Sequence, residues 1–390
     1  MTKTFMGYRN PDGSVGIRNH IVVLPMVICA NSVVQQIEKQ VPEVIGIPHT
    51  HGCTLDPVSN QEMTAILGAI GSNPNVAGII LVALGCESVL LHEVAEIIAK
   101  TKKPVETLVI QELGGTKKTI AKGVELAKAL LEGAARRERE PIPYSELIVG
   151  TECGGSDSYS GLSANPAVGV ASDLHVDQGG TVILSEITEF LGAEAILADR
   201  CASPEVRQQL LDLVDWTEQS LAQLGSSNVA DITPGNLEGG LTTIEEKSLG
   251  CVKKGGSRTV QEVVGYGQKP SKRGLIVMDT PGHDIESITG IAAGGAHLIV
   301  FTTGRGTPTG SPVCPVIKVS SNTACYQNMQ DNIDLDAGLV ITKEETLDSM
   351  GAIIYDEIIQ VASGKQTKAE LSGNREFALR RYGSGGCIIY

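Results

Sequence analysis

The stretch NPNVAGIILVALGCE, residues 73–87, contains a run of apolar residues that ends in Gly-Cys-Glu. An apolar run of this length, bounded by turn residues, is typical of a strand that is buried on both faces of a parallel sheet. In such sheets, ligands bind beyond the carboxyl ends of the strands. The stretch therefore predicts a parallel sheet, and it places Cys86 where a ligand would bind.

Strands and helices alternate around this run. Further strands are expected at 20–27, 44–48 and 105–110, and helices at 31–40, 59–70, 88–100 and 116–134, the first of them capped by Asn31. Helices that connect parallel strands cover both faces of the sheet. Residues 1–140 are therefore predicted to form one α/β domain.

A second α/β unit is expected after the charged and proline-rich stretch ARREREPIPYS, 135–145, which is predicted to be a linker. Its strands are expected at 146–150, 181–185, 274–279, 296–304 and 314–320, and its helices near 165–176, 203–224, 242–254 and 345–363. We therefore predict two Rossmann-like parallel-sheet units with helices on both faces, the first at 1–140 and the larger second at 141–390.

Composition excludes several classes of partner. The chain has 390 residues, a formal net charge of −14 and 3% aromatic residues. The negative charge argues against nucleic acids and anionic membranes, and the few aromatic side chains argue against base stacking. No apolar run approaches the ~20 residues of a membrane span, and the N-terminal MTKTFMGYRN does not resemble a secretion signal. A cytoplasmic location is therefore expected.

Four of the nine cysteines follow predicted strands, a pattern that core packing does not account for. They are Cys29, Cys53, Cys86 and Cys153, and the motif PHTHGC places His49 and His51 beside Cys53. In a reducing compartment such thiols are ligands or nucleophiles, and several thiolates from separate loops suit iron. The spacing is not that of a zinc knuckle. We interpret the group as a metal or iron–sulfur site, with a Cys–His nucleophile pair and small buried side chains as alternatives.

Two glycine-rich motifs predict an anion-binding site. The turn GGSDSYSGLSANP, 154–166, opens a helix and offers N–H and hydroxyl donors, and its candidate ligands are Gly154, Gly155, Ser156, Asp157 and Asn165. In FTTGRGTPTGSP, 301–312, Arg305 stands between glycines and can bind a carboxylate through two hydrogen bonds. An ordinary capped turn and a solvated arginine are the alternatives.

Acidic and basic residues follow two further strands. MDTPGHD, 278–284, contributes Asp279 and His283, and SEITEFLGAE, 185–194, contributes three glutamates that are candidate bases or ligands, or else a solvated helix start. No dinucleotide-binding fingerprint follows the first strand and the sequence has no Walker A motif, which argues against hydride transfer and nucleotide hydrolysis. What remains is metal-assisted chemistry on a small polar anion.

The chain resembles the large catalytic region of the altronate and galactarate dehydratases. The resemblance runs from about residue 5 to about residue 340 through motifs that occur in this order: GYRNPDGSVGIRNH, PHTHGC, NPNVAGIILVALGCE, CGGSDSYSGLSANPAVG, GGTVILSE, PGNLEGGLTTIEEKSLG, MDTPGHD and FTTGRGTPTGSP. It implies a hydro-lyase that removes water from a sugar acid to give a 2-keto-3-deoxy acid, with iron as cofactor. A related branch, the large subunit of sulfolactate sulfo-lyase, expels sulfite instead. That branch lacks several cysteine and histidine positions found here, so the resemblance favours the dehydratases. A non-catalytic sugar-acid-binding subunit is a further alternative.

The resemblance also suggests roles for the candidate residues. Cys53, Cys86, Cys153 and Cys29 would hold Fe²⁺, or an iron–sulfur cluster with an open position, with Mn²⁺ as a substitute. His51 and His49 are the first candidates for the general base and Asp279 and His283 the second, while Arg305 and the 154–157 turn would bind the substrate carboxylate. Single-chain dehydratases begin with a small β-rich domain, whereas this chain starts at the GYRNPDG motif. A separate small β-rich subunit is therefore expected, in an oligomeric enzyme. The alternative is that this chain does not encode the complete active site.

Overall fold

The computed structural model describes residues 3–53, 56–223 and 232–380. Contacts divide the chain into two compact units, whose main parts are Met6–Ile142 and Pro143–Glu376. Both contain a parallel sheet flanked by helices, which confirms the predicted α/β class. Whether the units fold independently, as the predicted domains 1–140 and 141–390 require, stays a prediction.

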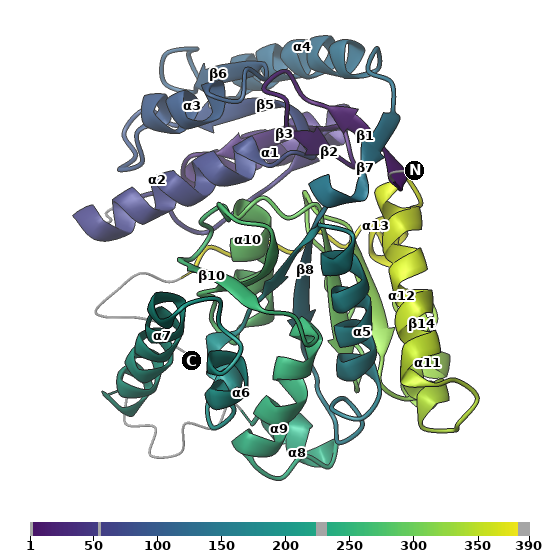
Figure 1. Cartoon of the computed structure of the whole chain (residues 1–390). Helices are drawn as coiled ribbons and strands as arrows, with labels where there is room; N and C mark the ends of the chain where they lie inside the picture. The colour runs from purple at the N-terminus through teal and green to yellow at the C-terminus, as the bar shows by residue number, and fades with distance from the viewer. Residues whose placement is uncertain (1–2, 54–55, 224–231, 381–390) are drawn as a thin grey trace. The chain divides into compact units, whose positions relative to one another are not determined.

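The first unit is built on a four-stranded sheet of order β4-β3-β5-β6, in which neighbouring strands are parallel (Figure 1). Its elements are β3 (His20–Pro25), α1 (Asn31–Gln40), β4 (Ile45–Gly46), α2 (Pro57–Ser72), β5 (Val76–Ala83), α3 (Leu91–Ala99), β6 (Val105–Val109) and α4 (Thr116–Ala134). The strand predicted from the apolar run, β5, is buried at every residue. Its Ile80 belongs to the core formed with α1 and α4, whereas Ile79 lies beside Gly71 of α2 and Ile98 of α3. Helices therefore cover both faces of the sheet.

The second unit contains a seven-stranded parallel sheet of order β10-β11-β9-β8-β12-β13-β14. The strands are β8 (Ile148–Cys153), β9 (Thr181–Leu184), β10 (Val260–Val264), β11 (Gly274–Met278), β12 (Leu298–Thr303), β13 (Val316–Ser320) and β14 (Leu335–Asp336). The helices are α5 (Ala164–Asp177), α6 (Glu194–Ala198), α7 (Pro204–Gln223), α8 (Pro234–Glu238), α9 (Ile244–Cys251), α10 (Asp284–Ala293), α11 (Thr323–Asn328), α12 (Leu347–Ala362) and α13 (Lys368–Ser372). Two 3₁₀ turns matter below, η3 (Ile187–Phe190) and η4 (Val252–Gly255).

The central strand β8 sends alternate side chains to opposite faces of this sheet. A Cβ at Gly150 would lie 2.3 Å from Ile291 of α10, so this face of β8 packs directly under α10. Glu152, two residues on, shares that face, and its carboxylate accepts a hydrogen bond from Ser287 of α10. Cys153 points to the other face, where its sulfur lies 3.5 Å from that of Cys251 at the end of α9. The last two residues of β8 therefore place a carboxylate on one face of the sheet and a thiol on the other.

The stretch 135–145 is more ordered than a free linker. Residues Glu140–Pro143 form β7, which joins β1 (Thr4–Arg9) and β2 (Val15–Gly16) in a small sheet of order β2-β1-β7. The guanidinium of Arg137 donates to the side chains of Asn10 and Asn19. Arg139 donates to the carbonyls of Met6 and Ile17 and lies over the Tyr8 ring. The two arginines therefore anchor this stretch.

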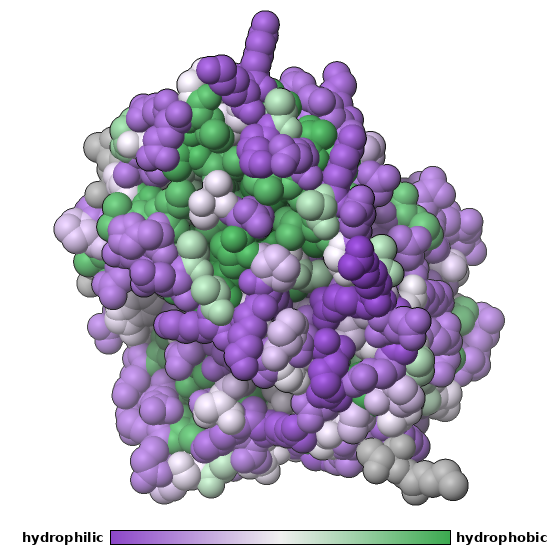
Figure 2. Space-filling model, turned by 90° about the horizontal axis from the view of Figure 1, so that it is seen from above, coloured by the Kyte–Doolittle hydropathy of each residue, from purple (hydrophilic) through white to green (hydrophobic). Residues whose placement is uncertain are grey.

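The first unit also has a groove of about 660 Å³ between α3 and the edge strand β6. Alternate residues of β6, Val105, Thr107 and Val109, line it together with α3. Seen from above, apolar side chains gather among polar ones (Figure 2). The cysteines predicted as ligands are not among its described lining residues, but Gly85 and Glu87, the neighbours of Cys86, are. Among the described residues, no helix combines the length and hydrophobicity that a membrane crossing needs.

Native trypsin should cut after Arg136 before it cuts after Arg137 or Arg139. The side chain of Arg136 is exposed, whereas the other two are held by the hydrogen bonds described above, and proteolysis follows exposure and local hydrogen bonding. Mass mapping of the earliest fragments checks the order. A first cut after Arg139 would show that the arginine anchors do not hold in solution.

Candidate functional site

Both sheets have a point where the strand order reverses, and open α/β sheets bind ligands at such points. In the first unit the reversal lies between β3 and β5, and in the second between β8 and β12. The loops that follow these strands carry Cys29 and Cys86 in the first unit and the 154–157 turn and Arg305 in the second. Sequence reasoning therefore selected residues at the edges where topology favours a site.

Backbone hydrogen bonds hold the three cysteine-bearing loops of the first unit together. The N–H of Ile28 donates to the carbonyl of His51, and the N–H of Ser88 donates to that of Gly52. Gly52 has φ 109°, and a Cβ there would lie 2.3 Å from the carbonyl oxygen of Met26. Only glycine accommodates this conformation and this approach. The PHTHGC loop therefore lies directly against the loop that carries Cys29.

Both ring nitrogens of His49 are engaged by the backbone. Nε2 lies 2.7 Å from the carbonyl oxygen of Pro25, and Nδ1 accepts the N–H of His51. Burial, partly opposed by the Pro25 hydrogen bond, lowers the pKa of His49 to about 4. The Asn31 side chain, predicted to cap α1, instead donates to the carbonyl of His49, and α1 has Ala30 as its uncapped N-cap residue. These contacts fix the loop that presents half-buried His51.

The cysteines of the first unit, Cys29, Cys53 and Cys86, are exposed. In the part of the chain that the structure describes, no set of three candidate ligands that includes them lies within 4.8 Å of one another. The fourth predicted ligand, Cys153, belongs to the second unit. The four-cysteine iron site stays a prediction.

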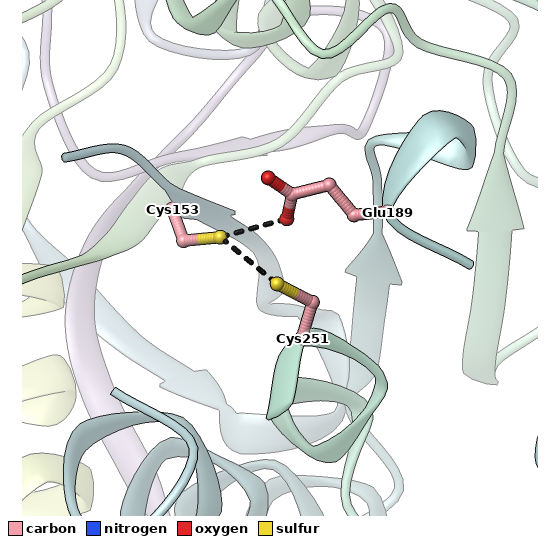
Figure 3. Close-up of side chains that lie close together, drawn as sticks. All are labelled: Cys153, Glu189 and Cys251. Atoms are coloured by element: carbon pink, nitrogen blue, oxygen red, sulfur yellow. Dashed lines mark hydrogen bonds between the residues drawn. The ribbon is translucent and has the colours of Figure 1, made fainter. Parts of the chain in front are cut away.

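Cys153 has two close partners within its own unit (Figure 3). Its thiol donates to Oε2 of Glu189 at 2.8 Å, and its sulfur lies 3.5 Å from that of Cys251. The three side chains come from the end of β8, from η3 and from the end of α9, and all are buried. Burial raises the pKa of Cys153 well above its usual value. The hydrogen bond with Cys153 lowers the pKa of Cys251, but burial and the charge of Glu189 outweigh it and raise that pKa as well. Both thiols therefore keep their protons unless a metal displaces them.

Two buried lysines neutralise the glutamates beside the thiols. Lys254 Nζ lies 2.7 Å from Glu186 and 3.5 Å from Glu189, and Lys247 Nζ lies 2.9 Å from the other oxygen of Glu189. Burial alone would raise the pKa of Glu189, but Lys247 and Lys254 lower it to about 2. Burial would likewise lower the pKa of Lys254, but the groups around it, Cys153, Glu186 and Glu189, raise it well above its usual value. Buried charges of this kind are tolerated because they are paired.

Glu186 has a backbone conformation that non-glycine residues rarely adopt. Its φ of 68° and ψ of 69° are left-handed, at a cost of roughly 1 kcal/mol or more. Its N–H donates to the Thr280 hydroxyl, and one carboxylate oxygen accepts both Lys254 and the N–H of Cys153. Burial and the charge of Glu189 raise the pKa of Glu186 to about 7, although Lys254 opposes this. The conformation turns Glu186 from β9 toward the end of β8.

The thiol pair and Glu189 fit a soft divalent metal. In a tetrahedral site with metal–sulfur bonds of about 2.3 Å, two sulfurs lie about 3.7 Å apart, close to the 3.5 Å between Cys153 and Cys251. A divalent ion that replaces two thiol protons leaves the net charge unchanged, so both lysines can stay paired with their glutamates. The residues present therefore suit a metal ion such as iron. Cys251, one of the three candidate ligands, was not predicted from the sequence.

Cys251, Lys247 and Lys254 were missed by sequence reasoning. They lie at i, i+4 and i+7 in IEEKSLGCVKKGG, 244–256, so a helix places them on one face. Polar residues at helical spacing normally indicate a solvated face, and these are buried. The helical spacing was therefore visible in the sequence. On its own it indicates a solvent-exposed helix face, because the buried glutamates that pair with the lysines lie elsewhere in the chain.

The predicted anion-binding residues lie at the reversal between β8 and β12, but their side chains are engaged. The carboxylate of Asp157 accepts hydrogen bonds from Ser160, Ser321 and Asn322, so it anchors the turn. The Asn165 side chain accepts the hydroxyl of Thr302 at 2.6 Å.

Arg305 is tied to the same turn, because its N–H donates to the carbonyl of Gly155. Its guanidinium is 42% exposed, donates to the Gly235 carbonyl and pairs with Glu238 at 2.8 Å. Of the second-choice acid–base residues, His283 is exposed at the N-cap of α10 and Asp279 is half-buried after β11. Their predicted roles, like those of Gly154 and Ser156, are not decided by these contacts.

Comparison with known families covers nearly the whole chain. Residues 7–135 match the family described as D-galactarate dehydratase/altronate hydrolase, second domain. Residues 144–384 match D-galactarate/altronate dehydratase, C-terminal.

Curated relatives include two kinds of lyase. The chain is 36% identical to (2R)-sulfolactate sulfo-lyase subunit beta of Chromohalobacter salexigens, over 97% of each chain. It is 34% identical to altronate dehydratase of Bacillus subtilis, over 98% of this chain and 78% of that one. It is 38% identical to galactarate dehydratase (L-threo-forming) of Escherichia coli, over 93% of this chain and 73% of that one.

Replacement of Lys254 by Met should lower the free energy of unfolding by roughly 3–5 kcal/mol, because it leaves buried Glu186 without its cation. The matched control is Lys122→Met, which breaks an ion pair with Glu125 between side chains that are 43% and 67% exposed. Such pairs contribute only ~0–1 kcal/mol. Urea denaturation of the three proteins measures the difference, and equal losses in both variants would contradict the charge assignment.

Proposed function

Because this chain belongs to the galactarate and altronate dehydratase family of lyases, we propose that it dehydrates a sugar acid to a 2-keto-3-deoxy acid with the help of a bound metal. The observation that carries the proposal is the family match together with a buried group of side chains, at the end of β8, that could hold a metal ion. In this reaction the carbon next to the carboxylate loses a proton and the following carbon loses its hydroxyl, so water leaves. The resulting enol then becomes the 2-keto acid.

The metal is assigned to Cys153, Cys251 and Glu189, with iron as the proposed ion. When bound, it supplies Lewis-acid stabilisation for the negative charge that develops as the proton leaves. Lys247 and Lys254 hold Glu189 between them, which fixes the orientation of its carboxylate. Cys29, Cys53 and Cys86, the other ligands predicted from the sequence, remain part of the proposal.

Arg305 is the proposed partner of the substrate carboxylate. The turn at Gly155 fixes its backbone, and its exposed guanidinium is paired with exposed Glu238, a partner that an incoming carboxylate can replace. Asp157 holds the turn in shape through its hydrogen bonds, and its role in substrate binding stays a prediction.

His51 is the proposed general base. Both ring nitrogens of His49 form hydrogen bonds with the backbone, at Pro25 and at His51. We therefore assign His49 the role of positioning the loop that carries His51. Asp279 and His283, beyond the carboxyl end of β11, are the alternative acid and base in the second unit.

A second candidate is supported by the match to the sulfo-lyase subunit, which covers 97% of both chains. Elimination of sulfite from a sulfolactate begins with the same proton loss beside a carboxylate, and only the leaving group differs. The identities of 34–38% with the two kinds of lyase do not rank them. The word subunit in that relative's name also supports a multi-subunit enzyme, and we propose a small β-rich subunit as the partner.

Purified chain, loaded anaerobically with Fe²⁺, should release a 2-keto-3-deoxy acid from altronate or galactarate, alone or with a small β-rich subunit. Substitution of Cys153 or Cys251 by serine should remove most of the iron and lower kcat at least ~10-fold, since the thiolates are metal ligands. Cys314→Ser is the matched control, because this buried thiol bonds the carbonyl of Ala296 and lies outside the proposed site.

Keto-acid release, sulfite release and bound iron are measured in parallel. Sulfite from sulfolactate, without keto acid from the sugar acids, would select the sulfo-lyase. Binding of the acids without release of either product would identify a non-catalytic subunit. Full activity in protein without metal would contradict the metal assignment.

A further inference from the structure

The sheet of the first unit ends in a strand whose outer edge is open. In the order β4-β3-β5-β6, the strand β6 has one neighbour among the described strands, β5. An edge strand presents a row of backbone N–H and C=O groups, and proteins normally shield such a row with charge, proline or a covering segment. Here Thr107, at the centre of β6, is exposed. The edge is therefore accessible to a further strand.

The hydrogen bonds to β5 show which backbone groups of β6 face outward. The N–H of Ile79 donates to the carbonyl of Pro104, and the N–H of Ile110 donates to the carbonyl of Ala83. Because successive residues of a strand point their backbone groups in alternate directions, the even-numbered residues of β6 face β5. The odd-numbered residues face the open edge, and they are Val105, Thr107 and Val109. At the end of the strand, the carbonyl of Val109 also accepts the N–H of Leu113.

The side chains of the same three residues line the groove between β6 and α3. On the α3 side, Leu91, Ala95 and Ala99 stand four residues apart and give the groove an apolar wall. Its acidic lining residues are Glu87, Glu96 and Glu112, which repel an anionic ligand. The groove and the edge therefore suit a protein surface with a strand to add, apolar side chains at its centre and a basic residue at its rim.

A second copy of this chain offers such a surface through its own β6. When two β6 strands run antiparallel about a two-fold axis at Thr107, each Thr107 faces its counterpart and Val105 faces Val109. All residues in these pairs point their backbone groups outward, so the register joins hydrogen-bonding positions to one another. Pro104 has no N–H, but its backbone faces β5 and leaves the edge free.

The same register brings opposite charges together at both ends of the strand pair. Lys102 lies five positions before Thr107 and Glu112 five positions after it, so the two-fold axis places Lys102 of one copy near Glu112 of the other. Both side chains are exposed, and Glu112 lines the groove. Within the strands, Glu106 faces Leu108 rather than another carboxylate. The edge is therefore complementary to itself in charge as well as in hydrogen bonding.

We propose that two copies of the chain associate through β6, so that their four-stranded sheets become one continuous sheet of twice four strands. Two-fold dimers are the commonest oligomers, and strand addition at a sheet edge is a recurrent mode of recognition. Because the axis stands perpendicular to the sheet, both grooves lie on the same face, and the two α3 helices flank a shared floor that contains Val105 and Val109. Association removes this apolar surface from water and pairs the backbone groups of the edge.

Self-association of the full chain, measured by sedimentation velocity over a range of concentrations, tests the proposal. We expect a dimer, and Thr107→Pro should weaken it at least ~10-fold, because it removes an N–H at the centre of the strand pair from each copy. This N–H faces away from β5, so the substitution leaves the sheet within each copy intact. Thr107→Val is the matched control, since it keeps the backbone donor and should keep the dimer.

A charge exchange gives a second test that does not depend on proline. Lys102→Glu and Glu112→Lys should each weaken the dimer at least ~3-fold at low salt, because each places like charges together at both ends of the strand pair. The double variant, which restores opposite charges, should restore the dimer. Both positions are exposed, so the variants should fold as the unmodified chain does.

Amide hydrogen exchange, followed by mass spectrometry, locates the interface. The peptide that contains β6 should exchange more slowly as the concentration of the chain rises. A chain that remains monomeric, or a dimer that neither Thr107→Pro nor the charge variants weaken, would overturn the proposal. Protection of β6 only after a different, small subunit is added would assign the edge to that partner and would overturn the proposal as well.

Discussion

The pairing of Lys254 with Glu186 and Glu189 is the interaction on which the second unit's site depends. A lysine with no exposed surface can stay charged only beside carboxylates, and these glutamates can stay ionised in the interior only beside lysines. The pairing joins η4 to the loop after β9, and through the N–H of Cys153 it also reaches β8. Three segments that are distant in sequence are thereby held at one edge of the sheet.

Because side chains alternate along β8, its last two residues, Glu152 and Cys153, place their functional groups on opposite faces of the sheet. Cys153 carries the thiol toward α9, where Cys251 and Glu189 form a set of soft and hard donors. Glu152 carries a carboxylate toward α10, where Asp284 begins the helix. Glu186 serves both sides, with one oxygen on Lys254 and the other without a described partner.

The fold was predicted well where the hydrophobic pattern alone determines the local structure. The apolar run at 76–83 is long, bounded and buried, so its strand and the helices after it follow from periodicity. The helix at 116–134 has the predicted ends. The sheet β2-β1-β7 was missed because β2 and β7 are short, and ARREREPIPYS resembles a linker until the partners of Arg137 and Arg139 are known.

The site was predicted less completely, because its members are distant in sequence. Strand-end position identified Cys153, and the same argument drew attention to Glu186 and Glu189. Nothing local distinguishes Cys251, Lys247 or Lys254 from an ordinary polar helix face, since their role comes from partners about 60–100 residues away. Asp157 and Asn165 show the reverse case. Their motif predicts contacts with a ligand, but the Asp157 carboxylate already accepts the hydroxyl of Ser321, just after β13, and Oδ1 of Asn165 accepts that of Thr302 in β12.

The central claim is that Cys153, Cys251 and Glu189 bind a metal ion at the edge of the sheet where β8 ends. Anomalous diffraction from crystals soaked anaerobically with iron, recorded at the iron absorption edge, tests it most directly. The account predicts an iron peak between the sulfurs of Cys153 and Cys251. Crystals without a peak there, or with iron bound only elsewhere, would contradict it.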